Sequence, residues 1–156
     1  MELDYRTDLP TLEQAKSELD RWQTEEQSAH DGGDSQKARD CRAMAERMTR
    51  VINRLVNLPP GRSFPLPITL WRVGDAVWLA VEGEHYNVLQ RALRERFAGV
   101  PIIVATLANG SRPTYLPTKD TYGKGIYQES IALLAPGSLE QLIRAIGDEV
   151  QTKLTD

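Results

Sequence analysis

The spacing of apolar residues predicts two amphipathic helices in the first third of the chain. Thr11 and Gln14 have the spacing of a capping box, which marks the start of the first helix. A polar segment at 30–34 interrupts the pattern, and Asp34 is placed to cap a second helix. The apolar face of that helix recurs at intervals of three and four residues: Ala38, Cys41, Ala45, Met48, Ile52 and Leu55. The short polar connection predicts that residues 1–58 form an antiparallel helical hairpin.

After Pro59-Pro60 the pattern becomes that of strands. Residues 68–73 and 76–81 are rich in β-branched and aromatic residues, and Gly74-Asp75 between them suits a type II′ hairpin turn. From His85 to position 97 the period is that of a helix. A continuous apolar run at 100–106 then predicts a strand buried on both faces.

The last part of the chain combines a long loop with a final helix. Residues 109–137 are rich in Gly, Pro, Thr and Tyr, and long loops of this kind are often functional. Apolar residues then recur at helical spacing from 139 to 154. The predicted class is therefore α/β. The helical hairpin at 1–58 would pack beside a small mixed sheet with a βαβ crossover and a C-terminal helix at 59–156, in one compact unit.

The βαβ order also predicts which loops meet. Strand 76–81, helix 85–97 and strand 100–106 place two parallel strands in one sheet, so the loops that follow both strands lie at the same edge. Glu84 follows the first strand and Tyr115 follows the second. We therefore expect Glu84 and Tyr115 to be neighbours in space.

Composition narrows the class of protein. A net charge of −3 and a pI near 5.5 disfavour a nucleic-acid binder, and no apolar run approaches the length of a membrane span. The lone cysteine, Cys41, excludes an internal disulfide framework and a cysteine-rich zinc site. The first residues lack a signal-peptide pattern. If the chain is complete, this predicts a cytoplasmic protein; a longer parent chain leaves secretion or a periplasmic location open.

Candidate chemistry concentrates in the segment Glu82-Gly83-Glu84-His85. Two carboxylates and an imidazole at the end of a strand could bind a metal or transfer protons. The simpler alternative is that both acids stabilise the start of the following helix, where negative charge is favoured. No zinc-protease or nucleophile-elbow spacing occurs. The glycines of "YGKGIY" at 122–127 do not lie between a strand and a helix, as a phosphate-binding loop requires.

Three segments in order resemble one known family. "GDAVWLAVEGEHYNVLQRALRERF", "ANGSRPTYLPTKDTYGKGIYQES" and "APGSLEQLIRAIGDEVQTKL" are similar to the C-terminal part of the catalytic domain of the neutral/alkaline ceramidases. The similarity extends from about Leu70 to Leu154 and includes the order, spacing and loop chemistry. The resemblance implies a zinc-dependent amidohydrolase that cleaves the N-acyl amide of ceramide or a related lipid.

The resemblance also implies roles for individual residues. Glu84 matches the family's glutamate zinc ligand and Tyr115 its tyrosine ligand, while two histidines from elsewhere in the parent protein would complete the site. No residue of this chain is assigned a catalytic role beyond metal binding. The residues expected to shape the site are Gly83, Asn109, Thr118, Tyr122 and Tyr127.

The sequence departs from the family pattern at several positions. Glu82 stands where the family has proline, Gln128 stands where Tyr-Glu is usual, and neither His30 nor His85 falls in a matching motif. We therefore expect a segment of a longer ceramidase-like enzyme, inactive alone and with weak or no zinc binding. Its partners would be the remaining parent chain and a ceramide-like lipid. The alternative is a stand-alone, non-catalytic interaction module that forms homo-oligomers through its helical hairpin.

Overall fold

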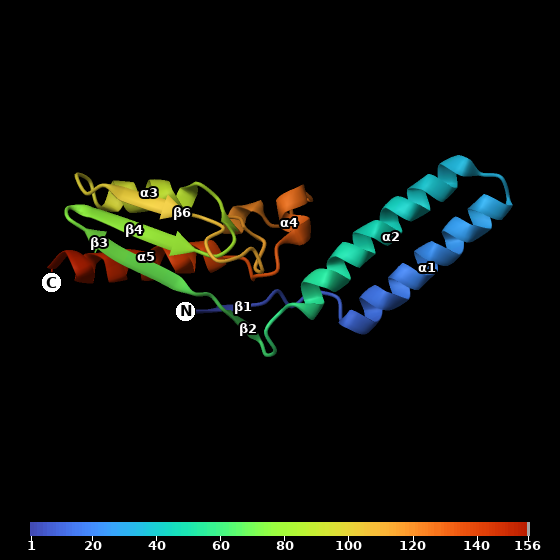
Figure 1. Ribbon diagram of the computed structural model, residues 1–156, viewed down its shortest axis with the longest axis horizontal. Helices are drawn as coiled ribbons and strands as arrows, with labels where there is room; N and C mark the ends of the chain where they lie inside the picture. The colour runs from blue at the N-terminus through green and yellow to red at the C-terminus, as the bar shows by residue number, and fades with distance from the viewer. Residues whose placement is uncertain (156) are drawn as a thin grey trace. The chain divides into compact units, whose positions relative to one another are not determined.

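The structure is a computed structural model that describes residues 1–155, and the chain forms two compact units rather than one. The first, residues 8–58, is the predicted helical hairpin, with α1 (Leu12–Asp31) antiparallel to α2 (Ser35–Val56) (Figure 1). The predicted caps are confirmed. The Gln14 amide donates to Thr11 Oγ1 at 3.1 Å, and the Lys37 amide donates to Asp34 Oδ1 at 3.0 Å. The buried residues of the hairpin are small: Ala15, Ala29, Ala38, Cys41 and Ala45.

The second unit comprises residues 1–7 together with the chain from Pro59 onward. Its first element is a short antiparallel ribbon of β1 (Glu2–Asp4) and β2 (Ser63–Pro65). Leu3 and Phe64 are opposite each other in this ribbon and are fully buried. The first seven residues, which the sequence pattern assigned to the hairpin, therefore belong to the α/β unit.

A three-stranded mixed sheet forms the middle of the α/β unit. The strands lie in the order β3 (Ile68–Val73), β4 (Ala76–Val81) and β6 (Ile102–Ala105). β3 pairs antiparallel with β4 through the predicted turn, where Gly74 has a φ of 60°. β4 pairs parallel with β6, and α3 (Val88–Arg96) connects them. The α/β class, the hairpin turn and the βαβ crossover are thus confirmed.

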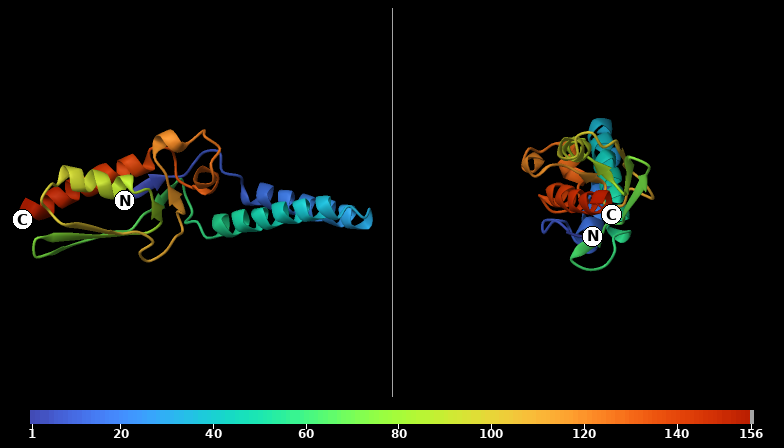
Figure 2. Two further views of the ribbon diagram at one scale, coloured as in Figure 1. Left: turned by 90° about the horizontal axis from the view of Figure 1, so that it is seen from above. Right: turned by 90° about the vertical axis from the view of Figure 1, so that its left-hand side faces the viewer.

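Helices cover one side of this sheet. α3 and α5 (Ser138–Thr155) lie together on that side (Figure 2). They bury the alternate residues Val77, Leu79 and Val81 of β4. The predicted burial of the last strand on both faces is wrong. β6 is an edge strand whose Ile103 is 38% exposed on the opposite side, in line with the exposed Trp71 and Trp78.

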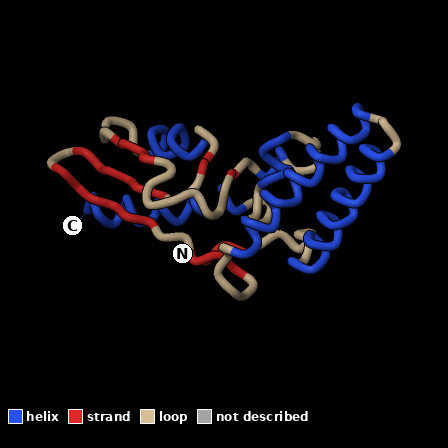
Figure 3. The backbone as a smooth tube through the Cα atoms, turned by 45° about the vertical axis from the view of Figure 1, so that its right-hand side comes forward, coloured by secondary structure: helices blue, strands red, loops and turns tan. Residues whose placement is uncertain are grey.

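The segments around the sheet's end contain short elements that the sequence pattern did not predict (Figure 3). β5 (Glu84–His85) pairs with β7 (Tyr115–Leu116), and the short helices η1 (Lys119–Thr121) and α4 (Tyr127–Ile131) follow. Because residues 84 and 85 form a strand, the helix predicted from His85 begins at Val88. Among the described residues, no helix has the length and apolarity that crossing a membrane requires.

Candidate functional site

Glu84 and Tyr115 lie directly beside each other on adjacent strands. β5 and β7 are parallel, with Glu84 in register with Tyr115. The Glu84 amide donates to the Thr114 carbonyl at 2.8 Å, and the Tyr86 amide donates to the Leu116 carbonyl at 3.2 Å. The expectation that the two residues are neighbours is confirmed, and a parallel strand pair fixes their separation.

The two side chains interact. Hydrogen bonding to the Glu84 carboxylate is the main cause that raises the pKa of Tyr115 above its ordinary value of 10.0. Removing the phenol proton would also place a second negative charge beside the carboxylate, which raises the pKa of Tyr115 further. Both side chains are half-buried. The phenol of Tyr115 therefore keeps its proton beside the Glu84 carboxylate, at a position that solvent can reach.

Replacing Glu84 with glutamine should lower the pKa of Tyr115 toward its ordinary value. The carboxamide keeps the shape of the side chain but carries no charge, so the phenolate no longer faces a second anion. The measurement is a pH titration of the tyrosine ¹³Cζ resonances in the full chain. Tyr122 is the internal control because its hydroxyl donates to the Leu134 carbonyl at 2.9 Å. An unchanged titration of Tyr115 would contradict the pairing.

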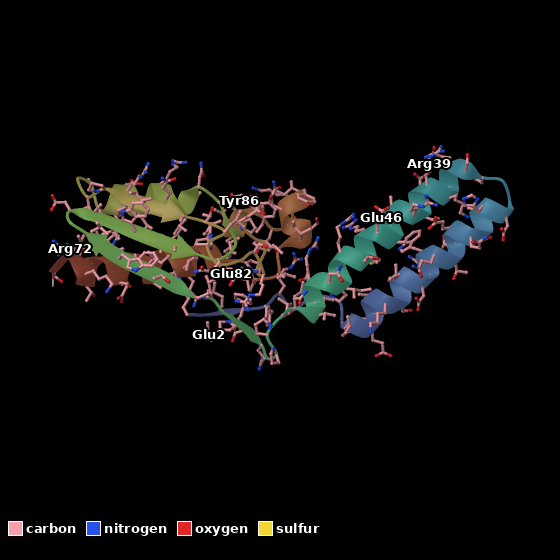
Figure 4. The ribbon with its side chains drawn as sticks, in the orientation of Figure 1. Glu2, Arg39, Glu46, Arg72, Glu82 and Tyr86 are labelled. Atoms are coloured by element: carbon pink, nitrogen blue, oxygen red, sulfur yellow. The ribbon has the colours of Figure 1, made fainter. Side chains whose placement is uncertain are left out.

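Two more tyrosines stand close to this pair. The Tyr127 ring meets the Tyr115 ring edge to face, with 6.3 Å between centroids, and is 65% exposed. Tyr86 acts electrostatically on Tyr115 and lies just beyond β5 (Figure 4). Tyr127 was among the expected site-shaping residues, whereas Tyr86 was not. Its place one residue after β5 follows from the strand, which the helical pattern concealed.

The predicted helix-capping role of Glu82 and Glu84 is wrong. α3 begins at Val88 with Asn87 as its cap residue, so both acids precede the helix by several residues. His85 also lies in the strand, and alternation along a strand places its side chain on the face opposite Glu84. Burial lowers the pKa of His85 to about 4, so its imidazole is neutral at pH 7.

Gly83 is the expected site-shaping residue with the closest neighbours. Its φ is 96°, and a Cβ there would lie 2.8 Å from Pro113 Cγ and 3.1 Å from the Thr114 carbonyl oxygen. Only glycine allows this approach of the two segments. Among residues 1–155, Asn109 is one of three non-glycine residues with positive φ, at 66°. It helps to set the course of the loop between β6 and β7.

Thr118 and Tyr122 make structural contacts further along the loop. The Thr118 hydroxyl lies 3.0 Å from the Thr121 hydroxyl within the η1 turn. The Tyr122 hydroxyl donates to the Leu134 carbonyl, and the Arg6 guanidinium lies 5.6 Å from the centre of its ring. These contacts fasten the loop to its own unit.

The amides of the glycine-rich segment at 122–127 bind a carboxylate of the same chain, that of Glu129. Glu129 accepts from the Gly123 amide at 2.7 Å and from the Gly125 amide at 2.8 Å. These bonds are the largest causes that lower the pKa of Glu129. The two amides that could have bound a phosphate therefore hold a side chain instead.

The sequence reasoning missed a buried ion pair beside the candidate site. Glu82 is only 1% exposed, and its carboxylate accepts from Arg112 Nε and Nη2, each at 2.8 Å. It also accepts from the Arg112 backbone amide at 3.1 Å. The only sequence signal was the presence of Glu82 where the resembling family has proline.

Comparisons with known proteins add no assignment to this geometry. No protein-family model, no curated protein and no solved structure matches the chain. Within residues 1–155, no three side chains of the His, Cys, Asp or Glu type gather as a metal site would require. The pair of Glu84 and Tyr115 thus offers one carboxylate and one phenol oxygen.

Proposed function

We propose that this chain supplies two oxygen ligands, Glu84 and Tyr115, to the zinc site of a ceramidase-like amidohydrolase. The observation that carries the proposal is their direct register across β5 and β7. Two residues 31 positions apart in the sequence occupy adjacent positions and are half-exposed, and the Glu84 carboxylate raises the pKa of Tyr115. The substrate class, an N-acyl amide of a sphingoid lipid, rests on the family resemblance of residues 70–154.

The donor set fits zinc in kind but is incomplete in number. Carboxylate and nitrogen ligands at about 2.0–2.2 Å are typical of zinc. A catalytic site usually has three protein ligands and one open position and can expand to five-coordinate, so four protein ligands still leave a position for water. When bound, zinc would polarise the amide carbonyl and lower the pKa of a water molecule. Within this chain, Glu84 would contribute charge and Tyr115 would lose its proton on binding. Two further ligands, proposed to be histidines of the rest of the parent protein, would complete the site.

The alternative of a non-catalytic interaction module has less support. That alternative expects Glu84 to cap the helix and Tyr115 to point into the core. Glu84 instead lies in a strand four residues before the helix begins, and Tyr115 is half-exposed and in register with Glu84. Both differences favour the half-site.

Imidazole in solution should partly replace the missing histidines. We expect the full chain to bind zinc weakly in calorimetric titrations and more tightly when imidazole is present, because imidazole can fill the remaining coordination positions. Apparent affinity should rise with pH, since Tyr115 must lose a proton. Glu84→Gln and Tyr115→Phe should each cost more than the roughly 10–100-fold in affinity that is typical of losing an outer-shell partner.

Matched variants separate this site from unspecific zinc binding. Tyr127→Phe removes a hydroxyl next to Tyr115 without touching either proposed ligand, so it should bind zinc like the wild-type chain. Zinc affinity that is the same in Glu84→Gln, Tyr115→Phe and wild type would refute the proposed site. Hydrolysis of a fluorescent ceramide by this chain alone would refute the idea that it holds only half of the ligands.

A further inference from the structure

The Glu82–Arg112 ion pair bridges the two segments that carry Glu84 and Tyr115. Glu82 precedes Glu84 by two residues, just beyond the end of β4 (Figure 4), and Arg112 precedes Tyr115 by three. The Glu82 side chain is completely buried, whereas that of Arg112 is 47% exposed. A buried carboxylate is stable only when its charge and lone pairs are satisfied, and here a single residue satisfies them with three hydrogen bonds.

The loop that Arg112 belongs to has an unusual backbone. Leu107, Asn109 and Thr114 have φ values of 58°, 66° and 59°, and Gly110 has a φ of 144°. Left-handed conformations are unfavourable for residues that carry a Cβ. Several within eight residues persist only where surrounding contacts impose them. The segment 107–114 therefore needs an external constraint to keep this shape.

Backbone hydrogen bonds show where the loop is held. The Ala108 amide donates to the Val81 carbonyl at 3.1 Å, and the Leu107 amide donates to the Gly83 carbonyl at 2.9 Å. In return, the Gly83 amide donates to the Gly110 carbonyl at 3.1 Å. All three bonds surround Glu82. Gly110 packs so closely on the carboxylate that a Cβ there would lie 2.7 Å from Glu82 Oε1.

We propose that the Glu82–Arg112 pair is a positioning device that holds residues 107–114 in this shape and thereby sets Tyr115 beside Glu84. The importance of this placement for zinc rests on the function proposed above. Glu82 stands where the resembling family has proline, a residue that fixes its own backbone. In this chain a charged side chain would provide the constraint, through contacts instead of a ring.

This positioning role requires the guanidinium group of arginine. Arg112 presents Nε and Nη2 to the two carboxylate oxygens as a planar fork, and its Cζ lies 5.2 Å from the centre of the Phe64 ring. Lysine keeps the positive charge but cannot form the fork or stack in the same way. Arg112→Lys therefore tests geometry separately from charge, and Glu82→Gln removes the charge while keeping the shape.

The experiment compares these two variants with wild type in the full chain, without metal. Amide hydrogen exchange is measured at Gly83, Glu84 and Leu107, together with the nuclear Overhauser contact between the Tyr115 and Tyr127 rings. We expect Arg112→Lys to lower protection at the three amides by about tenfold or more and to weaken the ring contact, with the amides of the β4 interior unchanged. Glu82→Gln should have the same local effect.

A second ion pair of the same unit provides the control. Arg96 Nη2 lies 2.8 Å from Asp148 Oδ1, and neither partner is buried, with side chains 43% and 75% exposed. Arg96→Lys should leave the exchange of all three amides and the Tyr115–Tyr127 contact unchanged. If Glu82→Gln does not fold, the comparison of Arg112→Lys with Arg96→Lys decides the question alone.

Two results would separate this inference from the proposed function. Unchanged protection and an unchanged ring contact in Arg112→Lys would overturn the positioning role, whatever zinc does. Lower amide protection of the loop in Arg112→Lys would support the positioning role. If zinc affinity is also the same in Glu84→Gln as in wild type, the zinc site is overturned while the positioning role stands. If both hold, Arg112→Lys should also weaken zinc binding in imidazole by about 10–100-fold.

Discussion

Replacing Arg112 with methionine should lower the free energy of unfolding of the α/β unit by about 2–4 kcal/mol at pH 7. The substitution keeps most of the side-chain volume but leaves the buried Glu82 carboxylate without its charged partner and with only the backbone amide of residue 112. The effect stays below the upper end for fully buried pairs, because Arg112 is 47% exposed and remains partly hydrated in the folded state.

The measurement requires a signal that comes from the α/β unit alone. The chain has three tryptophans, of which Trp22 lies in the helical hairpin and Trp71 and Trp78 lie in the sheet. In a Trp22→Phe background, fluorescence during urea unfolding reports on the α/β unit. Arg96→Lys is again the control, and it should change stability by less than about 1 kcal/mol because its ion pair is exposed.

The loss of unfolding free energy in Arg112→Met should depend on pH in a defined direction. In the wild-type chain, hydrogen bonding to Arg112 lowers the pKa of Glu82 below its ordinary value of 4.5. Glu82 therefore stabilises the fold above pH 4.5, and this contribution is lost as pH falls through the lowered pKa. Without Arg112, burial raises the pKa of Glu82 instead, so the buried carboxylate is destabilising at pH 7.

The difference between wild type and Arg112→Met should accordingly be largest near pH 7. It should begin to shrink as pH falls through the raised pKa of Glu82 in the variant, and shrink further below about 4.5, where the wild-type chain loses its own contribution. The double variant Glu82→Gln/Arg112→Met has no buried charge, so it should recover part of the lost stability and lose this pH dependence. An equal loss of stability at every pH would show that Arg112 acts through packing, for example on Phe64, and would contradict the electrostatic account.

The helices and the main sheet could be predicted because their determinants are local. The capping residues, the three-and-four spacing of α2 and the Gly74 turn each lie within one element or one turn. The proximity of Glu84 and Tyr115 was predictable for another reason. A parallel βαβ crossover brings the loops after both strands to one edge, whatever side chains the loops carry.

The details of the site depend on contacts between distant segments. β5 has only two residues and is followed closely by the apolar spacing of α3, so the pattern merged them into one helix. Its partner β7 follows a loop, 107–114, in which several residues have positive φ values that no local pattern predicts. Glu82 resembled a helix cap because nothing in its neighbourhood in the sequence identifies Arg112 as its partner.

Replacing Gly83 with alanine should also lower the free energy of unfolding of the α/β unit by about 2–4 kcal/mol, and it should disturb the candidate site directly. The φ of 96° is strained for alanine, and the new Cβ would meet Pro113 Cγ at 2.8 Å and the Thr114 carbonyl oxygen at 3.1 Å. The Thr114 carbonyl accepts from the Glu84 amide, so relieving the clash pulls β7 away from β5.

Gly74→Ala separates backbone strain from this close approach. Gly74 also has positive φ, at 60°, but a Cβ at this position would have no neighbouring atom within 4 Å. Alanine there should therefore cost only about 1–2 kcal/mol. Urea unfolding in the Trp22→Phe background gives both values. The contact between the Tyr115 and Tyr127 rings should weaken in Gly83→Ala and persist in Gly74→Ala. Suppose that Gly83→Ala and Gly74→Ala lose the same stability and that the Tyr115–Tyr127 contact persists in both variants. The segments around Gly83 and Pro113 can then separate without moving Tyr115.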